Sequence, residues 1–283
     1  MITTPTRPFL ATCWYVIIAT TLCFAVASPA ILGALPAEAA GVLVPAAQLT
    51  PFLTAIAFFL VRWRRRFVSV FALRWGRSWP AIGIGLAAVV AIAGLQLGVG
   101  LLSGAPMQPS GMIAAASTAV LILFVMQCVF AVGEELGWRG WLVTQLETRP
   151  FWQIAGVSSL VWVVWHLPAL PLIVGDGGWE PGAAYLLAIA SCAPFMVALR
   201  LWSGSVWPAV IVHGALNSIR VFLTQSIAVS DGINWTVEIA GALLWLAAAV
   251  MMHRRLRRRT SRTMTQPRAI SRHPTHGGAS SPS

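Results

Sequence analysis

Two adjacent glutamates stand inside apolar sequence, where a membrane tolerates few charges. Glu134 and Glu135 follow twenty-one residues without a charge, Met112–Val132, and Arg139 comes four positions after Glu135. An ionisable side chain at membrane depth costs several kcal/mol, roughly 2.5–3.5 on insertion scales, so it usually faces the protein interior and often has a function. This segment is therefore the first place to look for chemistry.

Helical geometry gives the two glutamates different partners. Positions 135 and 139 share a helical face, with the glutamate on the favourable amino-terminal side. Glu134 points about 100° away from that face, because an α-helix has 3.6 residues per turn. The spacing predicts a structural Glu135–Arg139 ion pair and leaves Glu134 free in a cavity. The alternative is a helix that ends near Val132, followed by charges that reach back to the membrane surface.

Two further motifs place polar side chains one helical turn apart. They are Trp162-x-x-x-His166 and His213-x-x-x-Asn217. Taken singly, each fits a packing role or a hydrogen bond between helices. However, Glu134, His166 and His213 are expected at similar depth on three different helices, and independent packing would not require that agreement. The three segments together predict a polar cavity inside the membrane.

The composition fixes the class of protein that carries these motifs. The chain has 58% hydrophobic and 10% charged residues, whereas soluble domains carry about 25% charged residues. We expect an all-α polytopic membrane protein, a bundle of about eight transmembrane helices with an intramembrane polar cavity. The expected spans are residues 11–35, 41–61, 79–102, 115–146, 152–174, 182–201, 205–223 and 236–252.

The organisation along the chain is simple. Residues 1–259 are expected to form one transmembrane domain, and residues 260–283, rich in Ser, Thr, Pro and Arg, a disordered basic cytoplasmic tail. The first apolar stretch resembles a signal peptide, but its length and Pro29 favour an uncleaved helix. Gly94 and Gly98 form a GxxxG pattern, which predicts a close approach between helices.

The charges orient the bundle. All nineteen basic residues are arginines, and the formal net charge is +11. Cytoplasmic loops are enriched in basic residues, so their distribution predicts a multi-pass cell-membrane protein with both termini cytoplasmic. We expect membrane lipids, not nucleic acid, as partners of the basic segment 253–259. The arginines of the expected cytoplasmic side are Arg7, the cluster 62–77, Arg149, Arg200 and those from Arg254 onward, and the acidic residues opposite them are Glu38, Asp176, Glu180 and Asp231.

The three motifs together resemble a known family. The pattern EExxxR, then an aromatic residue four before His, then HxxxN, each on its own helix, is similar to the CPBP family of intramembrane proteases. This family is also called the Abi or CAAX-protease type and includes the prenyl-protein endopeptidase Rce1. The resemblance extends from Gly133 to Asn217. Trp162 stands where the family usually has phenylalanine, which we regard as a conservative change.

The resemblance implies both a fold and a reaction. The fold is a bundle of about eight helices around a conical cavity that opens to the cytoplasmic side and the membrane. The reaction is the hydrolysis of peptide bonds by an endopeptidase. Matched position by position, Glu134 is the general base that activates water, assisted by His166. His213 and Asn217 stabilise the oxyanion of the tetrahedral intermediate.

The resemblance also implies supporting residues and a class of substrate. Glu135, Arg139 and Trp162 would hold the site in place. The substrate would be a peptide or a membrane-protein segment. Because the short loops and the absence of lysine look bacterial, we expect a bacterial substrate in place of a prenylated protein. The oligomeric state does not follow from the sequence.

Three other functions use similar residues. A zinc protease could take Glu134, His166 and His213 as ligands. The chain has no HExxH motif, and its four cysteines form no CxxC pair, so we favour a mechanism without metal or other cofactor. A non-catalytic membrane scaffold or bacteriocin-immunity protein would use the polar cluster as a binding pocket. A transporter is less favoured because no internal repeat is evident.

Overall fold

The computed structural model describes residues 8–62, 66–175 and 178–265, and within these ranges the secondary structure is helical, with no strand. This confirms the predicted all-α polytopic fold. The elements are α1 (Pro8–Ile31), η1 (Ala37–Ala39), α2 (Ala40–Ala47), α3 (Thr50–Arg62), α4 (Phe67–Val70), α5 (Ser78–Leu102), α6 (Ser110–Glu135), η2 (Leu136–Leu142), α7 (Val143–Gln145), α8 (Phe151–His166), η3 (Leu167–Ala169), α9 (Leu170–Val174), α10 (Trp179–Ser203), α11 (Trp207–Thr224) and α12 (Asp231–Thr265).

Seven helical segments of the described residues are long and apolar enough to cross a membrane. The eighth expected span, 205–223, forms helix α11 but is not among the seven. Its polar residues His213, Asn217 and Arg220 lower its hydropathy. Because α11 packs against α5, α6 and α10, it lies inside the bundle, where such side chains find protein partners. The seven segments are Leu10–Ile31, Gly41–Val61, Ser78–Leu102, Ser110–Gln145, Phe151–Val174, Trp179–Ser203 and Asp231–Arg259.

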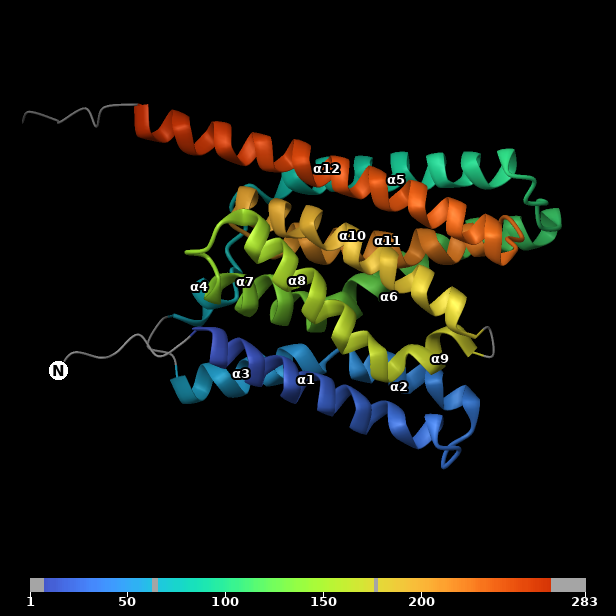
Figure 1. Ribbon diagram of the computed structural model, residues 1–283, viewed down its shortest axis with the longest axis horizontal. Helices are drawn as coiled ribbons and strands as arrows, with labels where there is room; N and C mark the ends of the chain where they lie inside the picture. Colours follow the sequence, from blue (N-terminus) through green and yellow to red (C-terminus); the bar gives the residue numbers. More distant parts are fainter. Residues whose placement is uncertain (1–7, 63–65, 176–177, 266–283) are drawn as a thin grey trace, which may run out of the picture.

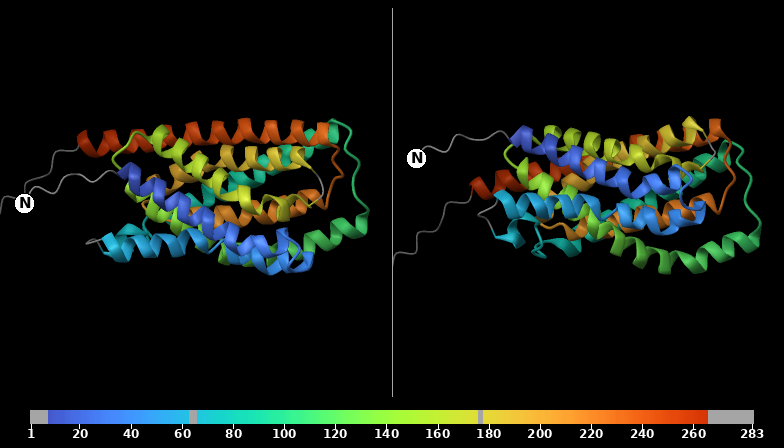
Figure 2. Two further views of the ribbon diagram at one scale, coloured as in Figure 1. Left: turned by 60° about the horizontal axis from the view of Figure 1, so that its bottom comes forward. Right: turned by 90° about the horizontal axis from the view of Figure 1, so that it is seen from below.

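The long helices lie side by side along the longest axis of the molecule (Figure 1). Helices α1, α2 and α3 pack together on one side, and α5 and α12 pack together on the opposite side. Helices α8, α10 and α11 lie between them, with α6 against α11, and the further views in Figure 2 show the same arrangement. The chain thereby brings α8, α11 and the buried carboxyl end of α6 together inside the bundle.

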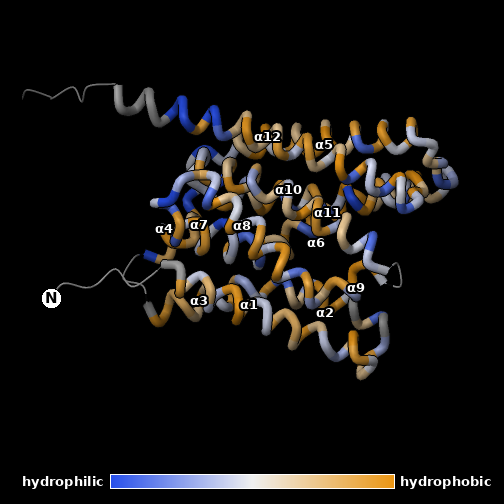
Figure 3. Tube along the Cα trace, viewed as in Figure 1, coloured by the Kyte–Doolittle hydropathy of each residue, from blue (hydrophilic) through white to orange (hydrophobic). Residues whose placement is uncertain are grey.

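The two ends of this bundle differ in charge. Helix α1 begins and α12 ends at the same end, which also holds α4 and α7 (Figure 1). Exposed arginines gather there, as the hydrophilic colouring in Figure 3 shows for the part of α12 that follows its apolar span. We call this the basic end; its exposed arginines are Arg66, Arg74, Arg77, Arg149, Arg254, Arg255, Arg257 and Arg258. The opposite end, with α9 and the α11–α12 connection, is the far end and holds Glu38, Glu180 and Asp231.

Helix α12 continues past the predicted limit of the transmembrane domain. It ends at Thr265, whereas disorder was expected from residue 260. Arginine favours helix, so the basic segment after the apolar span prolongs it. Residues 266–283 lie outside the described residues, as do Arg7 and Asp176.

Candidate active site

The chain changes its helical form at the two glutamates. Helix α6 ends at Glu135, and a π-helical segment, η2, continues it from Leu136 to Leu142. Segments of this kind frequently occur at functional sites. Gly133 lets the connection between α2 and α3 approach closely, since a Cβ atom there would lie 2.6 Å from the carbonyl oxygen of Gln48. A Cβ atom on Gly137 would lie 2.5 Å from Pro51 on α3 and 2.6 Å from the hydroxyl of Tyr15 on α1. The local sequence thus positions the glutamates against the amino-terminal helices.

The structure contains the ion pair that the i,i+4 spacing predicts. Arg139 Nη1 donates to Glu135 Oε1 at 2.8 Å, and both side chains are fully buried. The guanidinium of Arg139 also packs over the ring of Trp162, with its central carbon 4.1 Å from the ring centroid. Arg200 Nε in turn donates to the carbonyl oxygen of Arg139 at 3.0 Å. These contacts tie α6, α8 and α10 together around one buried charge pair.

Glu134 has two hydrogen-bond donors of its own. Gln48 Nε2 donates to Oε1 at 2.8 Å, and Trp162 Nε1 donates to Oε2 at 2.6 Å. The expectation of a free carboxylate is therefore wrong, because both oxygens are held. The view of Trp162 as a conservative replacement also needs correction. A phenylalanine ring has no N–H group, so this hydrogen bond depends on the indole of Trp162.

His213 lies between the two glutamates. Its Nδ1 is 2.9 Å from Glu135 Oε1, and its Nε2 is 3.9 Å from Glu134 Oε1. A carboxylate only accepts hydrogen bonds, so Nδ1 carries a proton in the pair with Glu135. Glu134 and Glu135 point to different sides of their own helix, yet both carboxylates lie close to the imidazole of His213 on α11. The sequence did not predict this bridge.

His166 and Asn217 are each fixed by one contact. His166 Nδ1 is 2.8 Å from the carbonyl oxygen of Trp162, so Nδ1 carries the proton and Nε2 of a neutral ring is available as an acceptor. Asn217 Nδ2 donates to Gln127 Oε1 at 3.0 Å. A carboxamide NH₂ group has two hydrogens, so one N–H of Asn217 remains for another acceptor.

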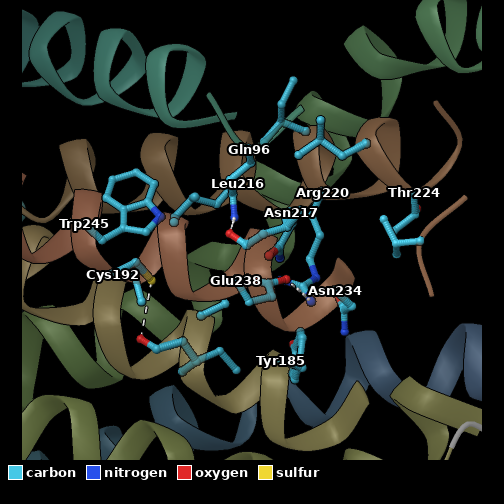
Figure 4. Close-up of a pocket in the computed structure, with 18 of the residues that line it drawn as sticks. Gln96, Tyr185, Cys192, Leu216, Asn217, Arg220, Thr224, Asn234, Glu238 and Trp245 are labelled. Atoms are coloured by element: carbon cyan, nitrogen blue, oxygen red, sulfur yellow. Dashed lines mark hydrogen bonds and ion pairs between the residues drawn. The ribbon is translucent and has the colours of Figure 1, made fainter. Parts of the chain in front are cut away.

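Glu134, His166, His213 and Asn217 line one cavity, whose volume is about 680 Å³. His166 is 5% exposed and His213 is 4% exposed, so the inner wall is nearly closed to solvent. A smaller pocket of about 140 Å³ shares His166, Tyr185, His213 and Asn217 with it (Figure 4). The polar residues that line the inner part of the larger cavity are Gln48, Gln127, Glu134, His166, His213 and Asn217.

Sequence reasoning missed Gln48 and Gln127. Both are carboxamides in otherwise apolar helical sequence, and that rarity was the available signal. Neither lies at a recognisable spacing from its partner, since 86 residues separate Gln48 from Glu134. Only the tertiary structure brings them together.

The residues that the structure describes do not provide the set of ligands that the zinc alternative requires. Among them, no three His, Cys, Asp or Glu side chains are grouped so that they could hold a metal ion. The two nitrogens of His213 face Glu135 and Glu134, and Nδ1 of His166 faces a backbone carbonyl.

One family model matches the central part of the chain. The model of the Rce1-like family, type II CAAX prenyl endopeptidases, matches residues 116–219. The matched segment is therefore similar to this family, and it contains Glu134, His166, His213 and Asn217. This family is one of proteases, so the match supports a peptidase with a peptide or protein substrate, and the seven apolar helical segments support a multi-pass membrane protein. No curated protein matches the chain. Gln48 lies outside the segment that the Rce1-like model matches.

Proposed function

We propose that this Rce1-like protein is an intramembrane endopeptidase in which Glu134 activates the attacking water. The observation that supports this most strongly is the placement of Glu134. Its carboxylate is 1% exposed, is held by two N–H donors, and lines a cavity together with His166, His213 and Asn217. A general base must lie within reach of its proton and be held in position.

The reaction proceeds in two steps. Glu134, assisted by Nε2 of His166, accepts a proton from water as the oxygen attacks the peptide carbonyl carbon. The tetrahedral oxyanion is stabilised by the remaining N–H of Asn217 and by Nε2–H of doubly protonated His213. The C–N bond then breaks, and the proton held by Glu134 passes to the departing amine. A single well-placed oxyanion donor contributes about 3–4 kcal/mol in known cases.

The other motif residues act as supports in this proposal. Glu135 holds Arg139 and His213, and Trp162 holds Glu134 while it packs under Arg139. These contacts fix the helices that carry the reacting groups. Such preorganisation is needed because small displacements of catalytic groups lower rates strongly.

The membrane setting is part of the proposal. Both termini are cytoplasmic, on the cell membrane, because the exposed arginines gather at one end of the bundle. The arginines from Arg254 to Arg259 contact anionic lipid head groups there. The substrate is a peptide or a membrane-protein segment of bacterial origin.

One assay tests the proposal. The purified full chain in liposomes is incubated with a peptide library, beside the Glu134→Gln variant and a sample treated with a chelator. Wild type should cleave peptides and the variant should not, although it reaches the same abundance. If cells that lack this protein show a defect and the Glu134→Gln variant restores them fully, a scaffold or immunity function is favoured instead.

A further inference from the structure

A second ion pair lies inside the bundle and has no part in the proposed reaction. Arg220 on α11 and Glu238 on α12 are 2.9 Å apart, between Nη2 and Oε1. An ionisable side chain at membrane depth is costly, and for that reason it often has a function. The family model matches residues 116–219, so both members of the pair lie outside the matched segment. The match therefore assigns no role to this pair.

The two members of the pair differ in exposure. The Arg220 side chain is 36% exposed, whereas the Glu238 side chain is 8% exposed. Arg220 lines both the larger cavity and the smaller pocket of Figure 4, whereas Glu238 lines only the smaller pocket. Glu238 therefore holds the guanidinium from the protein side and leaves its other side open to the larger cavity.

Arg220 lies close to the groups that carry the proposed reaction. His213, Asn217 and Arg220 are four and then three positions apart, which places them on one face of α11. Arg220 lies about 4.5 Å beyond Asn217 along the helix axis. Its guanidinium carbon is 5.0 Å from the ring centroid of Tyr185, and that centroid is 5.7 Å from the ring centroid of His166. A substrate group bound at Arg220 would thus lie within a few residues of a peptide bond held at Asn217.

The remaining donors of Arg220 suit a carboxylate. A guanidinium has five N–H donors in a planar fork, and the contact with Glu238 uses Nη2. The ring of Tyr185 covers a face of the guanidinium, so its edges stay available. Two parallel N–H groups match the two oxygens of a carboxylate. Among the described residues that line the larger cavity, Arg220 is the one arginine, while Glu134 and Asp231 would repel a carboxylate.

We propose that Arg220 is a specificity-determining residue that binds a carboxylate of the substrate, within a few residues of the scissile peptide bond. Glu238 is its positioning residue, because it holds the guanidinium without lining the larger cavity. The carboxylate belongs either to an acidic side chain or to the free carboxyl end of a peptide, since both present the same two oxygens. This inference rests on the proposed function for the cleavage, whereas the binding of a carboxylate can be measured without cleavage.

Matched peptides test this subsite in the full chain. The peptide library is made in pairs that differ in one group: Glu against Gln at an internal position, and a free carboxyl end against an amide. The wild-type chain in liposomes is compared with Arg220→Gln and Glu238→Gln. Wild type should favour one carboxylate set by roughly 10- to 100-fold in kcat/KM, mainly through KM, because a hydrogen bond to a charged group is worth that much. The favoured set identifies the source of the carboxylate.

The two variants should differ in their effect on this preference. Arg220→Gln removes the binding group, so the preference should disappear. Glu238→Gln keeps an oxygen that accepts from Nη2 but removes a competing negative charge, so the preference should persist or increase. If the pair only joins α11 to α12, both variants should lower Tm alike and leave the preference unchanged, and that result would overturn the inference. Arg220→Lys keeps the charge opposite Glu238 without the planar fork, so it should lose most of the preference even if Arg220→Gln does not accumulate.

A binding measurement separates this inference from the proposed function. The Glu134→Gln chain, with and without Arg220→Gln, is titrated with the same peptide pairs. The favoured carboxylate peptides should bind at least about tenfold more tightly when Arg220 is present. Equal Kd values, or no binding of any set, would overturn the inference. An absence of cleavage by wild type would count against the peptidase proposal, while the Kd values would still decide the carboxylate subsite.

Discussion

Two glutamate–arginine pairs lie within the bundle, and their surroundings differ. Glu135 and Arg139 are both fully buried, next to His213 and Trp162. Arg220 and Glu238 are as close, at 2.9 Å, but the Arg220 side chain is 36% exposed on the cavity wall. Figure 4 shows this second pair beside Asn217 and Tyr185. A buried pair loses most when one partner is removed, whereas an exposed partner can be solvated.

The largest effect is expected from breaking the buried pair. Glu135→Ala leaves Arg139 as an uncompensated buried charge and removes the partner of His213. The loss should be about 3–5 kcal/mol of stability, seen as low abundance and a lower Tm in detergent. The double variant Glu135→Leu/Arg139→Met, which removes both charges, should be less destabilised than Glu135→Ala. If the double variant is the less stable one, the interpretation of this pair is wrong.

Removal of a donor to Glu134 should affect activity more than folding. Trp162→Phe keeps an aromatic ring under Arg139 but loses the N–H group that donates to Glu134. A hydrogen bond to a charged group is worth about 1.5–3 kcal/mol, so kcat should fall roughly 10- to 100-fold. Abundance and Tm should change little. An unchanged kcat in Trp162→Phe would show that this hydrogen bond does not position the base.

Gln48→Leu provides the same test from the connection between α2 and α3, outside the segment that the family model matches. The change removes the N–H donor to Glu134 Oε1 at almost constant volume. We expect a loss in kcat of the same order as for Trp162→Phe, with KM little changed, because Gln48 would act through Glu134. Gln127→Leu is the matched comparison, since it removes a partly buried carboxamide that contacts Asn217 instead of Glu134. A change in KM alone for Gln48→Leu would argue for substrate contact in place of positioning.

The Arg220–Glu238 pair, in which only the arginine is partly exposed, should be the least sensitive. Glu238→Gln removes the charge that faces Arg220, and the guanidinium can turn towards water in the cavity. The expected loss is about 1 kcal/mol or less, measured as a small shift in Tm. A destabilisation as large as that of Glu135→Ala would erase the contrast between the two regions.

The sequence predicted what depends on spacing within one helix. The Glu135–Arg139 pair and the shared faces of His213 and Asn217 follow from helical periodicity, and the three motif helices do meet at one cavity. Contacts between distant segments did not follow, because no spacing links Gln48 to Glu134 or His213 to Glu135. These contacts exist only once the helices are packed.

The glycines illustrate the same limit. Gly94 and Gly98 form the GxxxG pattern, yet an added Cβ atom at either position would meet nothing within 4 Å, so the predicted close approach there is wrong. The close approaches occur at Gly133, Gly137 and Gly214, where a Cβ atom would lie 2.6 Å or less from a neighbouring residue. Which glycine faces a neighbour depends on helix rotation, which hydropathy does not determine.

Cleavage by the Glu134→Gln variant tests the central claim most directly. Glutamine keeps the size of the side chain but cannot accept a proton from water at its amide. With the purified full chain in liposomes, the account predicts peptide cleavage by wild type and none by Glu134→Gln at equal abundance, and no loss of wild-type activity on chelation. Cleavage at the wild-type rate by Glu134→Gln, or activity abolished by chelation and restored by zinc, would contradict it.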